Sequence, residues 1–138
     1  MEWYKDGLYP EWHLSGDNFS PKSLVQIFPE LTIASHHEKG EYGRHKWNKD
    51  KVYTYGSCKI VVEDKIVYKL DWLLDFIISN HEKVKELGVE REIIWLVWWG
   101  IQGNMELDKT LIEKLYITGL DMAMNYYYID DEPRAFED

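Results

Sequence analysis

The sequence predicts an α+β fold: a two-layer sandwich in which one mostly antiparallel sheet of about five strands carries three helices on one face. Its 138 residues suit a single domain with one core. Strand-like and helix-like patterns follow one another in the order strand, helix, strands, helix, strand, helix, strand. Because crossovers between strands of one sheet are right-handed, all three helices should lie on the same side. The expected arrangement is a ferredoxin-like variant with an additional helix and strand.

Capping and helix-breaking residues mark the ends of the predicted helices. Ser20 can accept a hydrogen bond from a free N–H group of a short first helix, which Pro29 stops. The second helix spans residues 71–87, where aliphatic residues recur at helical spacing. Asp108 can cap the third helix, and Gly119 ends it.

Strands are predicted from alternating and from continuous apolar patterns. We expect strands over residues 11–15, 52–62, 93–99 and 120–129, and a short hairpin partner over 66–68. The segment 93–99 is apolar on both faces, as expected of a central strand. No pattern appears in residues 30–51, which should form a long loop that is functional or disordered. The single domain then has a core over about 11–129 and an acidic tail over 130–138.

Charge and composition argue against several classes of function. With 16 basic and 25 acidic residues the net charge is -9, which disfavours binding to nucleic acid. An acidic chain suits a basic protein partner, although the charge can also serve solubility alone. The longest apolar run is far shorter than the roughly 20 residues that span a bilayer. Because the sequence has one cysteine and begins without a signal-peptide pattern, we expect a cytoplasmic protein.

No arrangement of residues predicts a reaction, so we do not expect an enzyme. The long loop holds the nearest approach to a metal site: His36, His37 and His45 with Glu38 and Glu41. Neighbouring histidines diverge in most backbones and no helical His pair exists, so neither a metal nor another cofactor is expected. Cys58 falls in a predicted strand, where a small buried apolar side chain is the expected role.

Seven tryptophans and ten tyrosines exceed what a core of this size needs, so some should lie at a surface. Alternation places Ile94 and Leu96 on the face that the helices should cover, and Trp95 and Trp99 on the opposite face of the sheet. The covered face should also carry Trp12 and Leu14 of the first strand and Met122 and Met124 of the last strand. Exposing an indole is costly, because it buries roughly 150–250 Å² at about 25 cal/mol per Å². The long loop, a second copy of the chain or another partner should therefore cover them. The expected binding residues are Trp95, Trp99, Tyr127, His13 and Asn125 on the sheet, with His37, Arg44 and Trp47 on the loop.

The stretch LSGDNFSPKSLVQIF (residues 14–28), followed by the Lys39-Gly40 pair, resembles the opening signature of a bacterial family known as domain of unknown function 4279. The later LDKTLIEKLYITGLDMAMNYYY is similar to the closing helix and strand of that family. The resemblance covers about residues 11–129 and implies a small α+β domain without established enzyme chemistry. Some similar small acidic proteins are suspected immunity proteins, which inhibit toxins.

Two functions remain open at this point. The first is a non-enzymatic protein-binding module, in its most specific form an immunity-type inhibitor of a basic bacterial toxin. The alternative is a small-molecule or anion-binding domain that uses the open sheet face and the basic loop 36–51.

Overall fold

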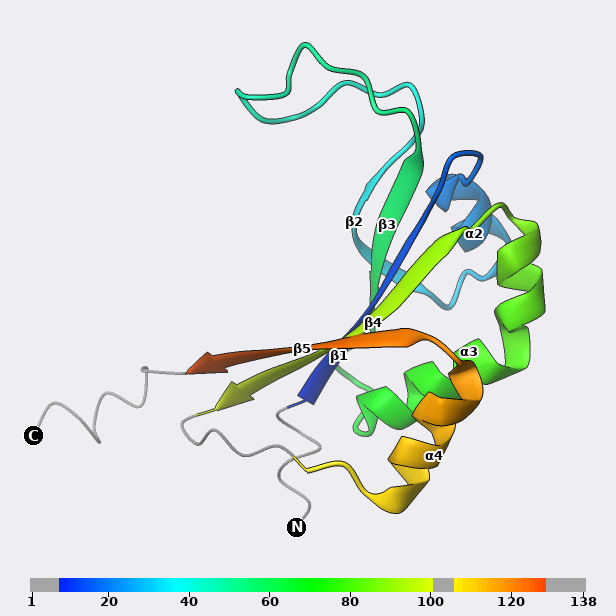
Figure 1. Cartoon of the computed structure of the whole chain (residues 1–138), viewed down its shortest axis with the longest axis vertical. Helices are drawn as coiled ribbons and strands as arrows, with labels where there is room; N and C mark the ends of the chain where they lie inside the picture. Colours follow the sequence, from blue (N-terminus) through cyan, green and yellow to red (C-terminus); the bar gives the residue numbers. More distant parts are fainter. Residues whose placement is uncertain (1–7, 101–105, 129–138) are drawn as a thin grey trace, which may run out of the picture.

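The computed structural model describes residues 8–100 and 106–128, which form one five-stranded sheet and three helices (Figure 1). The elements are β1 (Leu8–Gly16), α2 (Pro21–Ile27), β2 (Thr32–His37), β3 (Gly56–Val61), α3 (Lys69–Glu86), β4 (Arg91–Gly100), α4 (Lys109–Thr118) and β5 (Asp121–Tyr128). The strand order is β2-β3-β1-β4-β5; β4 and β5 are parallel and the other neighbours antiparallel. All three helices lie on one side of the sheet in Figure 1. The predicted α+β two-layer fold is confirmed.

Local capping explains where the shorter helices begin and end. At the start of α2, Ser20 Oγ accepts a hydrogen bond from the Ser23 N–H at 3.4 Å. At the start of α4, Asp108 accepts one from the Leu111 N–H at 2.9 Å. Gly119 ends α4 in the left-handed backbone conformation, with a φ of 67°. These ends agree with the sequence prediction.

Two strand predictions for the segment between β2 and α3 were wrong. α3 already begins at Lys69, so residues 66–68 do not form the expected hairpin strand. The Ile66 N–H instead donates to the Glu63 carbonyl at 3.0 Å, in a turn that leads into the helix. The strand expected over 52–62 begins only at Gly56, because the residues before it belong to a projecting segment.

The expectation that residues 30–51 lack regular structure was wrong for β2, which is an edge strand of the sheet. Its sequence, TIASHH, has no apolar alternation, and none of its side chains is fully buried. A register shift between Ile33 and Ser35 also interrupts the pairing with β3. Because of both features, a search of the sequence for side chains that alternate with a period of two does not detect this strand.

Residues 38–55 form a projecting arm between β2 and β3, which extends away from the rest of the sheet in Figure 1. Cross-links hold its two sides together: the Gly40 N–H donates to the Tyr53 carbonyl at 2.8 Å, and the Gly43 N–H to the Lys51 carbonyl at 3.0 Å. At its far end the buried Asn48 side chain accepts from the His45 N–H at 2.9 Å. The arm is therefore ordered by its own hydrogen bonds.

The hydrophobic core lies between the sheet and the helical layer. Its fully buried side chains come from β1, β3, β4 and all three helices, and include Trp12, Leu14, Leu24, Ile60, Leu73, Ile77, Ile94, Leu96 and Leu111. α3 packs against β1, and α4 packs against α3. No helix in residues 8–100 or 106–128 combines the length and the apolar character needed to cross a bilayer.

The helices do not cover the far edge of the sheet, where we expected them to cover Met122 and Met124. These two side chains are 44% and 58% exposed. The register pairs Met122 with Ile94 and Met124 with Leu96, so they do share the helical side of the sheet. They remain exposed because β5 is the outermost strand and α4 packs against α3.

Candidate binding face

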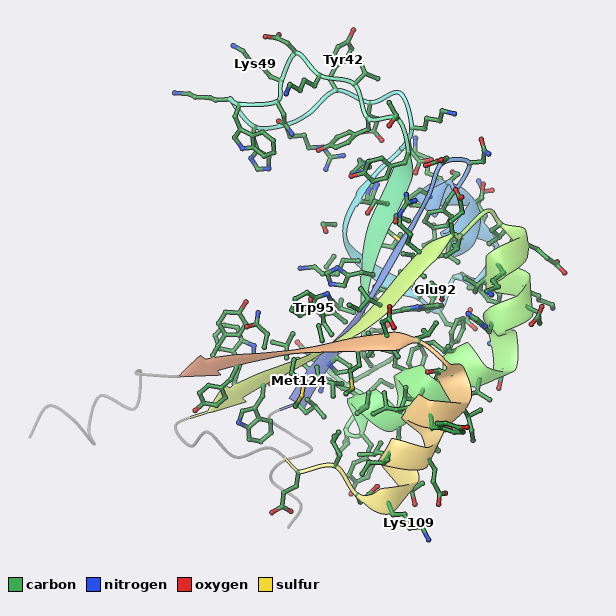
Figure 2. All side chains as sticks on the ribbon, viewed as in Figure 1. Tyr42, Lys49, Glu92, Trp95, Lys109 and Met124 are labelled. Atoms are coloured by element: carbon green, nitrogen blue, oxygen red, sulfur yellow. The ribbon has the colours of Figure 1, made fainter. Side chains whose placement is uncertain are left out.

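The face of the sheet opposite the helices, here called the open face, carries most of the predicted binding residues. It consists of alternate side chains of four strands: Ser57, Lys59 and Val61 of β3, Tyr9, Glu11, His13 and Ser15 of β1, Arg91, Ile93, Trp95, Val97 and Trp99 of β4, and Asp121, Ala123, Asn125 and Tyr127 of β5. Figure 2 shows Trp95 on the side of the sheet away from the helices. The structure thus places both indoles where the alternation predicts. Their role in binding remains a prediction.

Aromatic rings on the open face pair with one another. Trp99 of β4 stacks on Tyr127 of the adjacent β5, with ring centroids 4.4 Å apart and planes inclined by 17°. The Tyr127 hydroxyl accepts a hydrogen bond from Asn125 Nδ2 at 2.8 Å. Nearer the centre, the rings of His13 and Trp95 lie 5.8 Å apart. Mutual stacking removes part of each ring from water, yet Trp99 and Tyr127 stay 43% and 42% exposed.

The arm does not cover these rings. Figure 2 shows Tyr42 and Lys49 on the arm, well separated from Trp95 at the middle of the sheet. The loop was one of three expected covers for the indoles, and the structure removes it from consideration. A second copy of the chain and a different partner remain.

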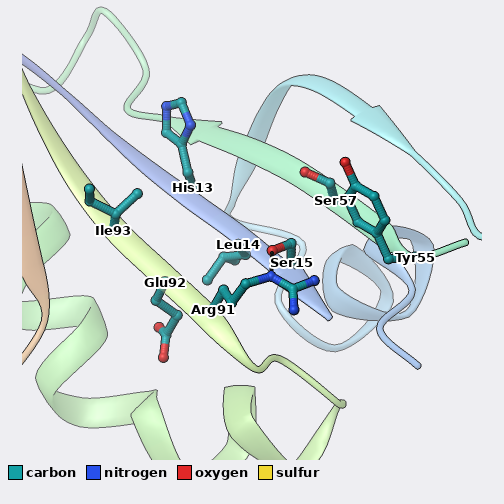
Figure 3. A pocket seen from close by; sticks show the side chains of 8 residues that line it. All are labelled: His13, Leu14, Ser15, Tyr55, Ser57, Arg91, Glu92 and Ile93. Atoms are coloured by element: carbon teal, nitrogen blue, oxygen red, sulfur yellow. Dashed lines mark hydrogen bonds between the residues drawn. The ribbon is translucent and has the colours of Figure 1, made fainter. Parts of the chain in front are cut away.

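A pocket of about 490 Å³ opens on the same face, at the end where β1, β3 and β4 meet the base of the arm. Figure 3 shows its lining: His13, Ser15, Tyr55, Ser57, Arg91 and Ile93, with Leu14 and Glu92 behind them. The Arg91 side chain donates from Nε to Ser15 Oγ at 3.0 Å, and its guanidinium lies 5.7 Å from the Tyr55 ring. A guanidinium held beside an aromatic ring can bind a carboxylate or another anion.

The sequence interpretation missed Arg91, Ser15, Tyr55 and Ser57 as site residues. Arg91 shares the alternation of Ile93 and lies two residues before the predicted strand 93–99, and Ser15 shares that of His13 within the predicted strand 11–15, so both were within reach of the alternation. Ser57 lies on β3 and Tyr55 just before it, and β3 pairs with a strand that is far away in the sequence, so no local pattern could link them to Arg91.

The predicted loop residues divide between the base and the outer part of the arm. His37 stacks on Tyr53, with ring centroids 3.5 Å apart, and meets Tyr55 edge-on at 5.0 Å. Burial is the main cause that lowers the pKa of His37. Arg44 pairs with Glu41 at 3.2 Å and lies farther out on the arm. The structure therefore brings His37 towards the pocket through Tyr55, but not Arg44.

Trp47 is the most exposed tryptophan in the described part of the chain. Its side chain is 76% exposed and stacks only loosely on His45, with ring centroids 5.6 Å apart. The arm around it carries five basic residues, Lys39, Arg44, Lys46, Lys49 and Lys51, against three acidic ones, Glu38, Glu41 and Asp50. A basic, aromatic arm thus projects from an acidic protein.

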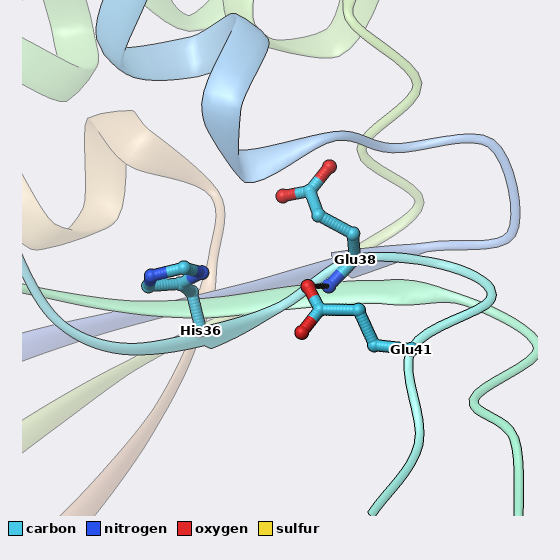
Figure 4. A group of neighbouring side chains, drawn as sticks. All are labelled: His36, Glu38 and Glu41. Carbon is cyan, nitrogen blue, oxygen red and sulfur yellow. Dashed lines mark hydrogen bonds between the residues drawn. The ribbon is translucent and has the colours of Figure 1, made fainter.

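His36, Glu38 and Glu41 form a group whose potential ligand atoms lie within 4.8 Å of one another (Figure 4). Hydrogen bonds within the protein already occupy both carboxylates. Glu38 accepts from Ser20 Oγ at 2.5 Å and from the Lys22 N–H at 3.2 Å, which ties the arm to the start of α2. Glu41 accepts from the Glu38 N–H at 2.7 Å, and this bond is the main cause that lowers the Glu41 pKa. These hydrogen bonds give the group a structural role, which is to hold the arm in place.

Cys58 faces the core from β3 and is 3% exposed. Burial is the main cause that raises the pKa of its thiol to about 12, and the charge of Glu38 adds to it. Because the thiolate is the reactive form of cysteine, this position cannot supply a nucleophile near neutral pH. The sequence prediction that Cys58 serves as a small buried apolar side chain agrees with this placement.

We expect native Cys58 to react with a thiol reagent such as Ellman's reagent at least about a thousandfold more slowly than in the unfolded chain, from its thiolate fraction alone. Above pH 9 the Cys58 thiol loses its proton in the unfolded chain and keeps it in the folded chain. Stability should therefore fall as the pH rises from about 9 towards 12. Stopped-flow labelling with and without guanidinium measures the rate; equal rates in both would contradict a buried thiol.

No family model, curated protein or solved structure matches the chain. The resemblance to domain of unknown function 4279 therefore remains a prediction, and a function has to be argued from the chemistry of the open face and the arm.

Proposed function

We propose that the chain is a non-enzymatic protein-binding module that holds its partner against the open face of the sheet. One observation carries the proposal: helices cover one face of the sheet, whereas the other exposes the stacked Trp99 and Tyr127 near the end of β4 and a pocket with Arg91 at its start. Tryptophan, tyrosine and arginine are the residues most enriched where binding energy concentrates in protein interfaces. The arm leaves this face accessible.

The charge of the chain favours a basic protein as the partner. The net charge of -9 would speed the encounter with such a partner and weaken the encounter with nucleic acid. An immunity-type inhibitor of a basic toxin is the most specific form of the proposal, and it rests on analogy with small acidic inhibitors. A cytoplasmic location would suit this role, because Cys58 would stay reduced there.

Trp99→Ala should weaken the complex with the partner by about thirtyfold or more, since truncating a central interface residue commonly costs about 2 kcal/mol or more. Tyr116→Ala provides the matched control, because this aromatic side chain is 86% exposed on α4, on the helical side. The measurement is affinity purification of each tagged chain from its native cells, followed by quantitative mass spectrometry. One basic protein should be enriched by the wild type and by the control variant, and depleted with Trp99→Ala.

Two results would count against the proposal. One is the absence of any specifically enriched protein with the wild type. The other is equal enrichment by Trp99→Ala and Tyr116→Ala, because the open face would then contribute nothing to binding.

The pocket beside Arg91 favours an alternative, a domain that binds a small anion. Its lining offers hydroxyl groups from Ser15, Ser57 and Tyr55 as well as the guanidinium, whose exposed ion pair with Asp17 Oδ1, at 3.6 Å, an anion would share or displace. Thermal stabilisation by millimolar inorganic phosphate that disappears in Arg91→Gln would favour this alternative over a protein partner.

A further inference from the structure

The outer edge of β5 differs from the opposite edge of the sheet. β2, at the other end, is polar and has its register shift between Ile33 and Ser35. β5 spans eight residues and pairs with β4 without a break in register. Within the described residues no strand pairs with its outer edge. Proteins commonly protect such edges with lysine, proline or a bulge, because an unpaired strand can add another strand. β5 has none of these devices.

Large apolar and aromatic side chains of β5 are accessible on both faces of the sheet. Met122 and Met124 are exposed on the helical side, and Tyr127 on the open face. From residue 122 to residue 128 the sequence, MAMNYYY, carries no charge, although 30% of the whole chain is charged. The only charged residue of the strand is Asp121, at its first position.

We propose that β5 pairs antiparallel with the β5 of a second copy, so that the sheets of the two copies become continuous. A twofold axis perpendicular to the sheet relates two strands in this way and keeps the helices of both copies on one side. Such an axis pairs residues of the same face. With Met124 at the axis, the Met124 side chains of the two copies face each other. Met122 of one copy then lies opposite Tyr126 of the other, which permits sulfur–aromatic contact.

The charge pattern favours a second copy over a foreign strand. Self-pairing with this register sets no like charges opposite each other, because Asp121 lies opposite Tyr127. A strand from a basic partner would gain from acidic side chains along β5, and the seven residues after Asp121 provide none. The inference rests on the backbone edge of β5 and does not depend on the function proposed for the open face. In the pair, the two open faces would adjoin.

Salt distinguishes this association from the binding of a basic partner. Two chains that each carry -9 repel at long range, and salt reduces this repulsion. Pairing through β5 should therefore strengthen as sodium chloride is raised. A complex with a basic protein should weaken under the same change.

Sedimentation velocity of the full chain, from micromolar to near-millimolar concentration, tests the proposal. We expect a reversible dimer. Met124→Lys and Met124→Glu should each raise the dimer dissociation constant by about tenfold or more, because like charges then face each other across the axis. An equimolar mixture of the two variants should form the dimer again. Ile112→Lys is the matched control, since Ile112 is 54% exposed on α4, and it should dimerise like the wild type.

The same experiment can overturn the proposal. A wild-type chain that stays monomeric at high concentration and high salt would overturn the proposal. This holds whether hydrogen exchange then shows the β5 amides open to solvent or covered by another part of the chain. A dimer that both Met124 variants leave unchanged would also overturn it. A mixture that fails to dimerise would refute the axis at Met124. Circular dichroism of each variant shows whether its fold is retained, and partner purification with Trp99→Ala reports on the open face separately.

Discussion

Replacement of Trp12 by alanine is expected to lower the free energy of unfolding by about 3–5 kcal/mol, the usual cost of removing a large buried aromatic side chain. Trp12 is 0% exposed in the centre of β1 and meets Phe76 of α3 edge-on, with ring centroids 6.1 Å apart. It thus joins the sheet to the helical layer. Because domains of this size are commonly stable by about 5–15 kcal/mol, this one change removes a large share of the total.

The indole of Trp12 also supports a buried carboxylate. Its Nε1–H donates to Glu92 Oε1 at 3.1 Å, and the other oxygen of Glu92 lies 2.7 Å from His81 Nε2. The Glu92 side chain is only 5% exposed, so it has few other sources of hydrogen bonds. Trp12→Phe keeps much of the apolar volume but removes the donor. We expect this variant to cost about 1–3 kcal/mol, the usual penalty for a buried acceptor left without its partner.

Urea unfolding at constant pH, with the transition midpoint and slope fitted for each variant, measures both costs. Trp47→Ala is the matched control, because the same substitution is made at a side chain that is 76% exposed on the arm. It should change stability by no more than about 0.5 kcal/mol. If Trp12→Ala and Trp47→Ala had equal effects, the indole of Trp12 would not lie in a packed core.

The sequence predicted which side of each central strand faces the core, because that choice is local. Ile94 and Leu96 alternate with Trp95 along the strand, and aliphatic side chains suit a closely packed layer under helices. The same reasoning placed Trp12 and Leu14 of β1 on one side. Burial in the structure follows this alternation: all of these side chains except Trp95 are at most 1% exposed.

Features that depend on strand order could not be predicted in this way. Whether Met122 and Met124 are covered depends on β5 being the outermost strand, which is decided by pairings between distant segments. The edge strand β2 has neither apolar alternation nor regular register, so its residues resemble a loop. The arm is held by hydrogen bonds between main-chain groups, such as that from Gly40 to Tyr53, which side-chain patterns do not report.

The candidate site likewise has a part that could be predicted from the sequence and a part that could not. The aromatic residues of the open face were predictable because each lies at an alternate position of a recognisable strand. The pocket was not, because it joins the end of β4, at Arg91, to the base of the arm, at Tyr55. No spacing in the sequence connects these two residues. Contacts made only by the fold are therefore the part of the site that the structure adds.

The second large effect on stability is expected at Gly16, the last residue of β1. A Cβ atom at this position would lie 2.1 Å from the carbonyl oxygen of Gly88, which follows α3. That neighbour is main chain and cannot turn away as a long side chain could. Gly88 is itself confined, since its φ is 97° and a Cβ there would lie 2.8 Å from the Asn18 carbonyl oxygen. The end of β1 and the turn after α3 thus meet at van der Waals distance without space for a methyl group.

We therefore expect Gly16→Ala to cost about 3 kcal/mol or more, at or above the upper end of what overpacking usually costs. Gly119→Ala separates lack of space from backbone strain. Gly119 has a φ of 67° and no atom within 4 Å of the place that an alanine methyl group would occupy, so only the left-handed conformation, about 1–2 kcal/mol, opposes alanine there. Thermal and urea unfolding of both variants provide the comparison. Equal losses would mean that β1 can move away from the turn, and that the close approach of Gly16 to Gly88 is not what holds these two segments together.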